Sequence, residues 1–164
     1  MTTDSVVAAD CQASTVPLDG QVWAVSWHPP PAPPEGAPHG AECVCVADQD
    51  QVVVISPNGE RWGFPAGRPE GSESGEETLH REVLEEAGAT VVRTRLLGFS
   101  RGVCTAGRQQ GVTLVRSIWR ADVRLDAWEP WFEMAHRQVV AATGPVLRVW
   151  FVEISWRRRC RAPR

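Results

Sequence analysis

Three glutamates stand close together in the sequence, Glu82, Glu85 and Glu86, and Arg81 directly precedes them. At about 100° per residue of an α-helix, the three carboxylates lie on one face, and Arg81 is placed to hold Glu85 at i, i+4. Like charges at this spacing destabilise a helix by a few tenths of a kcal/mol. A hard divalent cation such as Mg²⁺, which takes oxygen ligands, would offset that repulsion. The pattern indicates a cation site, and a solvated acidic helix face is the alternative.

The segment that carries these glutamates, residues 72–88, has the apolar spacing of an amphipathic helix. Leu79, Val83 and Ala87 form an apolar stripe beside the acidic face and are predicted to be buried. Gly88 stands where a left-handed residue commonly ends a helix. The sequence therefore predicts a helix that ends at Gly88, with its core-facing side next to its acidic side.

The stretch "GRPEGSESGEETLHREVLEEAGA", residues 67–89, resembles the Nudix box, G-x5-E-x7-R-E-U-x-E-E-x-G-U, in which U is aliphatic. All seven fixed positions of the motif are present at the required spacing. An agreement of this kind has a small false-positive risk. The resemblance implies a loop–helix–loop that binds Mg²⁺ or Mn²⁺ and hydrolyses a nucleoside diphosphate linked to another moiety.

The resemblance also implies roles for single residues. Glu85 and Glu86 match the metal ligands of the family, and Glu82 matches a ligand or a base that acts through water. Arg81 would orient the glutamates. The backbone carbonyl before the box glycine, here that of Ala66, would be a further metal ligand.

Three more residues match positions that support the loop–helix–loop. They are the box residues Gly67, Glu73 and Gly88. The family frequently supplies an extra carboxylate from a late loop, and Glu133 in "WFEMAHRQVV" is the candidate here, with Glu129 as the second choice. A plain surface carboxylate is the alternative reading of Glu133.

Signals for the substrate are weak. The chain has no Tyr, and no signature of a particular nucleotide class follows the box. Arg101 and Arg108 are candidates for contacts with phosphate, and Trp128 and Trp131 for stacking on a base. Surface exposure for the arginines and core packing for the tryptophans are the alternatives.

Strands are expected at residues 21–27, 41–47, 51–56, 90–100, 111–125 and 136–140, and a final helix from Pro145 onward. The polar stretch 101–111 is expected to be a loop. Together with the glutamate helix, these elements predict an α/β class with the Nudix fold, a mixed β-sheet sandwiched between helices.

The chain has 164 residues, which suits one domain at 20–160. Residues 1–19 are expected to form a flexible leader and residues 161–164 a basic C-terminal tail. Residues 28–40 contain six prolines and are expected to form a surface loop outside any strand ladder.

Charge is distributed unevenly: residues 1–89 carry three Arg against fifteen acidic residues, and residues 90–164 carry fourteen Arg against five. This asymmetry suits a cation site beside an anion site. No apolar run approaches the ~20 residues of a membrane span, and no signal peptide is recognised, so the cytoplasm is the expected compartment.

The sequence thus predicts a Mg²⁺-dependent (or Mn²⁺-dependent) pyrophosphohydrolase. Its expected partner is a nucleotide or a nucleotide-linked small molecule, with no membrane and no nucleic acid, and a homodimer is left open. The alternative is a catalytically silent Nudix-like domain that senses or binds a nucleotide. The intact set of glutamates favours the enzyme.

Overall fold

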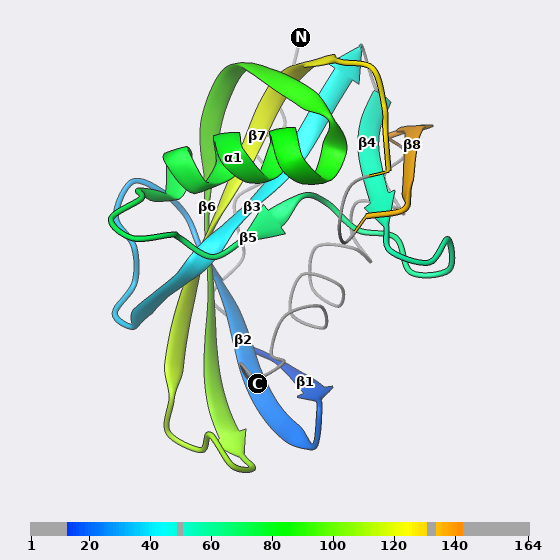
Figure 1. Ribbon diagram of the computed structural model, residues 1–164. Coiled ribbons are helices and arrows are strands. Elements are labelled where there is room, and N and C mark those ends of the chain that lie inside the picture. The colour runs from blue at the N-terminus through cyan, green and yellow to red at the C-terminus, as the bar shows by residue number, and fades with distance from the viewer. Residues whose placement is uncertain (1–12, 49–50, 131–133, 143–164) are drawn as a thin grey trace, which may run out of the picture.

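The computed structural model describes residues 13–48, 51–130 and 134–142. In this part of the chain, eight strands form one mixed sheet and one helix, α1, packs against it (Figure 1). The strand order is β1-β2-β6-β7-β3-β4-β8, and the short β5 pairs with β3. The pairing of β3 with β7 is parallel, and the other pairs are antiparallel. The predicted mixed sheet and α/β class are confirmed.

The strands have the following bounds. They are β1 Ser14–Leu18, β2 Gln21–His28, β3 Ala37–Asp48, β4 Gln51–Ser56, β5 Ala66–Gly67, β6 Ala89–Ala106, β7 Thr113–Leu125 and β8 His136–Ala141. The two long strands β6 and β7 run the length of the molecule, with α1 at one end and β1 and β2 at the other (Figure 1).

The helix α1 covers Gly75–Ala87 and has the predicted termination. Ser74 begins it with a capping box, in which the Ser74 side chain accepts from the Glu77 N–H and the Glu77 side chain accepts from the Ser74 N–H. Gly88 ends it with φ 54° and ψ 48°, a left-handed conformation that costs glycine little. Because both ends are capped, the orientation of the glutamate face is well defined.

The main core lies between α1 and the sheet. The predicted stripe of Leu79, Val83 and Ala87 is at most 1% exposed and packs against alternate residues of β3, including Cys43 and Cys45. A second cluster around Trp23 fills the end that contains β1 and β2. The opposite face of β4 packs on Phe64.

Three expectations about secondary structure need correction. Residues 14–18, assigned to the leader, form the edge strand β1. Residues 37–40, assigned to the Pro-rich loop, belong to β3, and Pro38 pairs with Val115 just before a register shift. Residues 101–106, expected to be a loop, continue β6, because buried Gly102 and Cys104 alternate with more exposed neighbours.

The predicted final helix and the basic tail lie outside the described residues. No described helix is long and apolar enough to cross a membrane.

Candidate functional site

The glutamates of α1 differ in their exposure. Glu82 and Glu86 are 7% and 6% exposed, although both are charged residues, whereas the Glu85 side chain is 47% exposed. Glu82 and Glu86 lie one turn apart at the border between the core stripe and the surface. Burial of two like charges one turn apart is unfavourable unless polar partners compensate it.

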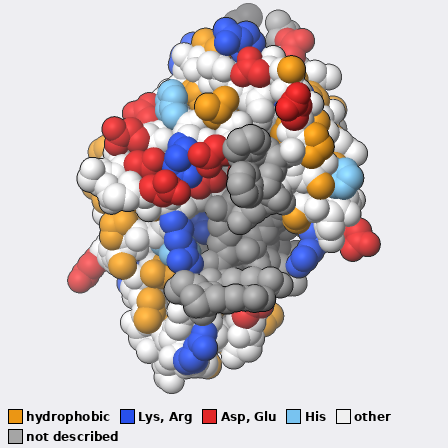
Figure 2. All heavy atoms as spheres, viewed as in Figure 1, with side chains coloured by type: hydrophobic (Ala, Val, Ile, Leu, Met, Phe, Trp, Pro, Cys, Tyr) orange, Lys and Arg blue, Asp and Glu red, His pale blue; other side chains and the backbone are white. Residues whose placement is uncertain are grey.

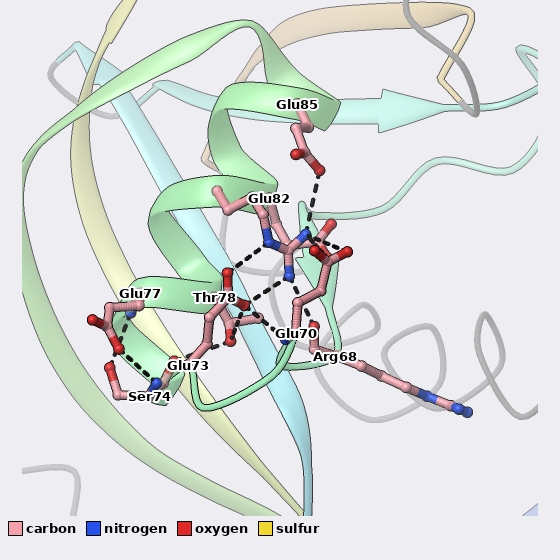
Figure 3. Close-up of polar contacts among 9 residues, drawn as sticks. Arg68, Glu70, Glu73, Ser74, Glu77, Thr78, Glu82 and Glu85 are labelled. Atoms are coloured by element: carbon pink, nitrogen blue, oxygen red, sulfur yellow. Dashed lines mark hydrogen bonds and ion pairs between the residues drawn. The ribbon is translucent and has the colours of Figure 1, made fainter.

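Arg81 supplies this compensation for Glu82. Figure 3 shows the side chains of Glu73, Glu82 and Glu85 turned toward one another at this place. Arg81 Nε and Nη2 each lie 2.9 Å from a carboxylate oxygen of Glu73, which is a bidentate pair. Its Nη1 donates to Glu82 Oε1 at 3.0 Å and to Glu85 Oε2 at 3.3 Å. The predicted contact with Glu85 is therefore present, and Glu73 is the stronger partner.

Glu73 holds the box loop to the helix. Its Oε2 also accepts from the Glu70 N–H at 2.9 Å and lies 3.1 Å from the hydroxyl of buried Thr78. The hydrogen bonds from Arg81, followed by that from Glu70, lower the pKa of Glu73 to about 2. The same carboxylate, together with Glu82, raises the pKa of Arg81 above its ordinary value. Both groups are thus ionised at neutral pH and lock the loop in one conformation.

The loop is also fixed from the other side. Arg81 Nη2 donates to the Arg68 carbonyl at 2.9 Å, and the Ala66 N–H donates to Glu86 Oε2 at 2.9 Å. A Cβ added to Gly67 would come within 1.4 Å of Glu82 Oε1. Only glycine therefore allows the Glu82 carboxylate to lie against the backbone of β5.

Acidic side chains consequently gather around one basic side chain on the face that carries α1 (Figure 2). The available metal ligands are carboxylate oxygens, with the backbone carbonyl of Ala66 as a further oxygen ligand. Such a set of oxygen ligands suits Mg²⁺ or Mn²⁺. Within residues 13–48, 51–130 and 134–142, no three acidic, His or Cys side chains converge closely enough to hold a metal ion by themselves. The chemistry of the donors fits a hard cation, and Arg81 bridges two of them in this arrangement.

The candidates for substrate contacts are dispersed. Arg101 Nε donates to the Glu35 carbonyl at 2.9 Å and so fastens the Pro-rich loop, and Arg108 is exposed in the turn after β6. Trp128 lies 5.0 Å from the guanidinium of Arg137 and packs on the core beside Gly88. Glu129 is exposed, and Trp131 and Glu133 lie outside the described residues.

Two structural features were not predicted. Arg137 of β8 donates to the carbonyls of Ala87 and Gly88, both at 2.9 Å, and so places a cation at the C-terminus of α1. Glu42 and Arg116 form an ion pair at 3.4 Å, and both are more than nine-tenths buried. A lone acid within the apolar stretch "AECVCVA" and a lone Arg within "TLVRSIW" were the available signals for that pair.

Comparison with solved structures identifies several with the same fold. A mutant of the pyrophosphohydrolase BsRppH from Bacillus subtilis is 23% identical, with a TM-score of 0.61 and coverage of 74% of this chain and 72% of that chain. The MutT protein from Bacillus halodurans is 23% identical, with a TM-score of 0.51 and coverage of 68% and 71%. A NUDIX hydrolase from Nitrosomonas europaea is 21% identical, with a TM-score of 0.50 and coverage of 76% and 81%.

No curated protein sequence matches the chain significantly. The model of the NUDIX domain family, in contrast, matches residues 37–135, which is more than half of the chain and includes the loop, α1 and strands β3 to β7. The chain therefore belongs to the Nudix family.

Proposed function

We propose that the protein is a divalent-cation-dependent pyrophosphohydrolase that cleaves a diphosphate bond in a nucleoside diphosphate-linked substrate by attack of water on phosphorus. The observation that carries this proposal is the burial of Glu82 and Glu86 in a network that ties both to the box loop, through Arg81 and through the Ala66 N–H. Burying two like charges one turn apart costs stability, so a bound cation gives a reason for their placement that anchoring of the loop alone does not.

Glu82, Glu85 and Glu86, with the Ala66 carbonyl, would hold Mg²⁺ or Mn²⁺. When bound, such an ion neutralises the diphosphate and lowers the pKa of a coordinated water. The protein's own part is to hold the carboxylates in a fixed orientation. Arg81 does this for Glu82 and Glu85, and the loop amide of Ala66 does it for Glu86.

A general base must also accept a proton from the attacking water. Glu82 is one candidate, because it is buried beside the loop, and Glu133 is the candidate from the late segment, with Glu129 as its competitor. Arg101, Arg108, Trp128 and Trp131 stay proposals for substrate contacts. Of these, Trp128 is the weakest, since the described contacts place it against the core and Arg137.

The decisive experiment is a screen of nucleoside diphosphate-linked compounds for phosphate-bond cleavage with Mg²⁺ and with Mn²⁺, followed by Glu86→Gln on the best substrate. The substitution removes charge but keeps an acceptor for the Ala66 N–H. We expect kcat to fall at least about a hundredfold, because the lost carboxylate acts in the transition state. Glu76→Gln is the matched control, since it removes the same charge from the first turn of α1, where the Glu76 carboxylate accepts from Thr94.

Near-wild-type turnover by Glu86→Gln at a saturating cation concentration would contradict the assignment of the site. Tight nucleotide binding without turnover on any compound would favour the alternative, a nucleotide-sensing domain. The exclusion of nucleic acid and the cytoplasmic location rest on the sequence and stay predictions, and the sequence leaves a homodimer open.

A further inference from the structure

A second group of charged side chains lies on the sheet face turned away from α1. Ala121 and Val123 of β7 belong to the core under α1, so the alternating residues Arg120 and Asp122 point to the opposite face. Arg93 and Arg95 of β6 lie across the ladder from Asp122 and Arg120, respectively. The arginines and Asp122 are therefore on the sheet face opposite Glu82, Glu85 and Glu86, whereas Thr94, between Arg93 and Arg95, faces α1 and donates to Glu76.

These side chains surround a recess. Its volume is about 280 Å³, and its lining consists of Arg93, Thr94, Arg95, Arg120 and Asp122. A single water needs roughly 10–15 Å³ of such space, so the recess is large enough for a small polyatomic ligand. Because three of the five lining residues are arginines, the interior has a positive potential.

Asp122 organises two of the three guanidiniums. Its Oδ2 accepts from Arg93 Nε at 2.9 Å and its Oδ1 accepts from Arg120 Nη2 at 3.1 Å. The hydrogen bond from Arg93 is the main reason that the pKa of Asp122 lies below its ordinary value. One carboxylate thus holds two cations in place and neutralises only one of them.

Arg95 is the unbalanced member. It lies directly opposite Arg120 in the antiparallel ladder, and within the described part of the chain no carboxylate pairs with it. Like charges directly opposite each other destabilise a sheet. Two other arginines of β7 lie on the same face as Arg120, and each has an acidic partner. Arg116 pairs with Glu42, and Arg124 pairs with Asp126. An anion between Arg95 and Arg120 would remove this unfavourable contact.

We propose that this recess, the β6–β7 arginine site, binds a phosphate-bearing small molecule, with Arg95 and Arg120 as its principal contacts. The planar guanidinium group suits the paired oxygens of a phosphoryl group and binds them by two parallel hydrogen bonds. Because Asp122 already orients Arg120, binding must order mainly the Arg95 side chain, which limits the entropic cost of binding. The site does not depend on the hydrolase proposed for the opposite face.

The test is a calorimetric titration of the full chain with inorganic pyrophosphate in the presence of EDTA. Under these conditions the glutamates of α1 hold no divalent cation and repel the anion, so binding reports on the arginine site. We expect one saturable site whose affinity falls at high salt. Arg95→Gln and Arg120→Gln should each weaken binding at least about fivefold, and Arg95→Lys, which keeps the charge but not the fork, should have an intermediate effect.

Arg124→Gln is the matched control, because Arg124 is on the same strand and face, is 70% exposed in its side chain and does not line the recess. It should change the affinity less than about twofold, since it removes only a distant surface charge. ADP in place of pyrophosphate identifies the source of the phosphate: equal affinity assigns recognition to phosphates alone, and tighter binding of ADP assigns a nucleotide.

The proposal is overturned if pyrophosphate and ADP show no saturable binding, or if Arg124→Gln weakens binding as much as Arg95→Gln does. Binding of a short RNA but of neither small molecule would also overturn it. Circular dichroism melts of each variant verify that the compared proteins are folded.

Discussion

Glu73 shows how one carboxylate can decide the geometry of a site in which it is not itself proposed to react. Its bidentate contact fixes the guanidinium of Arg81, and that guanidinium then fixes Glu82 and Glu85. Arg81 is therefore a positioning residue whose orientation is determined by the loop. Loss of Glu73 should leave Arg81 attached to the loop by the Arg68 carbonyl and by the longer contact with Glu70.

The depressed pKa of Glu73 gives a test by pH. The pKa of about 2 in the folded state lies below the ordinary 4.5 of the unfolded chain, so folding favours the ionised form. The contribution of Glu73 to stability is fully present above pH 4.5 and is lost as the pH falls towards 2. We expect the difference in unfolding free energy between the wild type and Glu73→Gln to be constant at neutral pH and to shrink over that acidic range.

Urea denaturation at pH values from 7 to about 2.5 measures this difference. The control is the same pair of proteins in an Arg81→Gln background, in which the pH dependence should largely disappear. A difference that stays constant down to pH 2.5 would show that Arg81 does not depress the pKa of Glu73.

At the scale of single residues, the helical period predicted well which side chains meet. It placed Leu79, Val83 and Ala87 in the core and Arg81 beside Glu85, because both relations depend only on spacing within one helix. It did not predict that the acidic face itself is partly buried. The burial of Glu82 depends on how closely β5 approaches the helix. Gly67 permits this close approach, but a glycine in the sequence does not by itself predict it.

At the scale of elements, the C-terminal end of α1 is stabilised by a residue that lies far from it in the sequence. Its own last turn contains no basic side chain, and the cation at its C-terminus comes from Arg137 of β8. Arg137 contacts the carbonyls of Ala87 and Gly88 and also that of Asp126 at 3.2 Å. This arrangement connects the C-terminal end of α1, the segment after β7 and the edge strand β8.

Arg137→Gln should therefore destabilise the protein by about 1–3 kcal/mol, because it removes a partly buried cation from the helix terminus and leaves carbonyls with poorer partners. Arg124→Gln, an exposed substitution nearby in the fold, should change stability by less than about 0.5 kcal/mol. Chemical denaturation of the three proteins gives the comparison. Equal stability of Arg137→Gln and the wild type would mean that water replaces the guanidinium without cost.

Elements that proline or polar residues obscure were the ones that the sequence did not predict. Pro17 lies in β1, at the edge of the sheet, where a missing N–H is tolerated, and Pro38 lies at the start of β3 before a register shift. In residues 101–106 the polar character of Arg101 and Thr105 concealed an alternating strand. The composition of a segment was misleading in each case, because its position in the sheet decides whether it can pair.

The Pro-rich loop is attached to the rest of the fold at its C-terminal end, through β3. Replacement of residues 29–38 by a short flexible linker would remove Pro38 from β3 and the Glu35 carbonyl that Arg101 holds. Pro33 and Pro38 also line a hollow of about 420 Å³ between this loop, the box loop and β6–β7. We expect such a replacement to lower the melting temperature by more than a few degrees in thermal denaturation. An unchanged melting temperature would show that these contacts contribute nothing.

At the scale of the whole molecule, the uneven distribution of charge along the sequence becomes a distribution over two faces. The acidic residues of the box gather on the α1 face (Figure 2), and Arg93, Arg95 and Arg120 lie on the other face of the sheet. A cation and an anion could therefore bind at the same time without competing for ligands. Their effects on stability should be separable.

Mg²⁺ should raise the melting temperature of the wild-type protein, because a ligand that binds only the folded state stabilises it by about 2.7 kcal/mol at a hundred times its Kd. A Glu85→Gln/Glu86→Gln double variant should melt at the same temperature with and without Mg²⁺. EDTA should reverse the effect on the wild type. A shift of equal size in the double variant would place cation binding elsewhere on the protein.

The long antiparallel pair β6–β7 has a consequence for how the chain folds. Its strands are joined by a short turn, in which the Gly111 N–H donates to the Cys104 carbonyl at 2.9 Å, so the ladder can close from neighbouring residues. The parallel pairing of β3 with β7 joins segments that are far apart in the sequence and must wait for a costlier loop closure. Pulse-labelled hydrogen exchange should therefore find the amides that bond between β6 and β7 protected before the amides of β3 that bond to β7, and the reverse order would exclude the hairpin as the nucleus on which the remaining strands assemble.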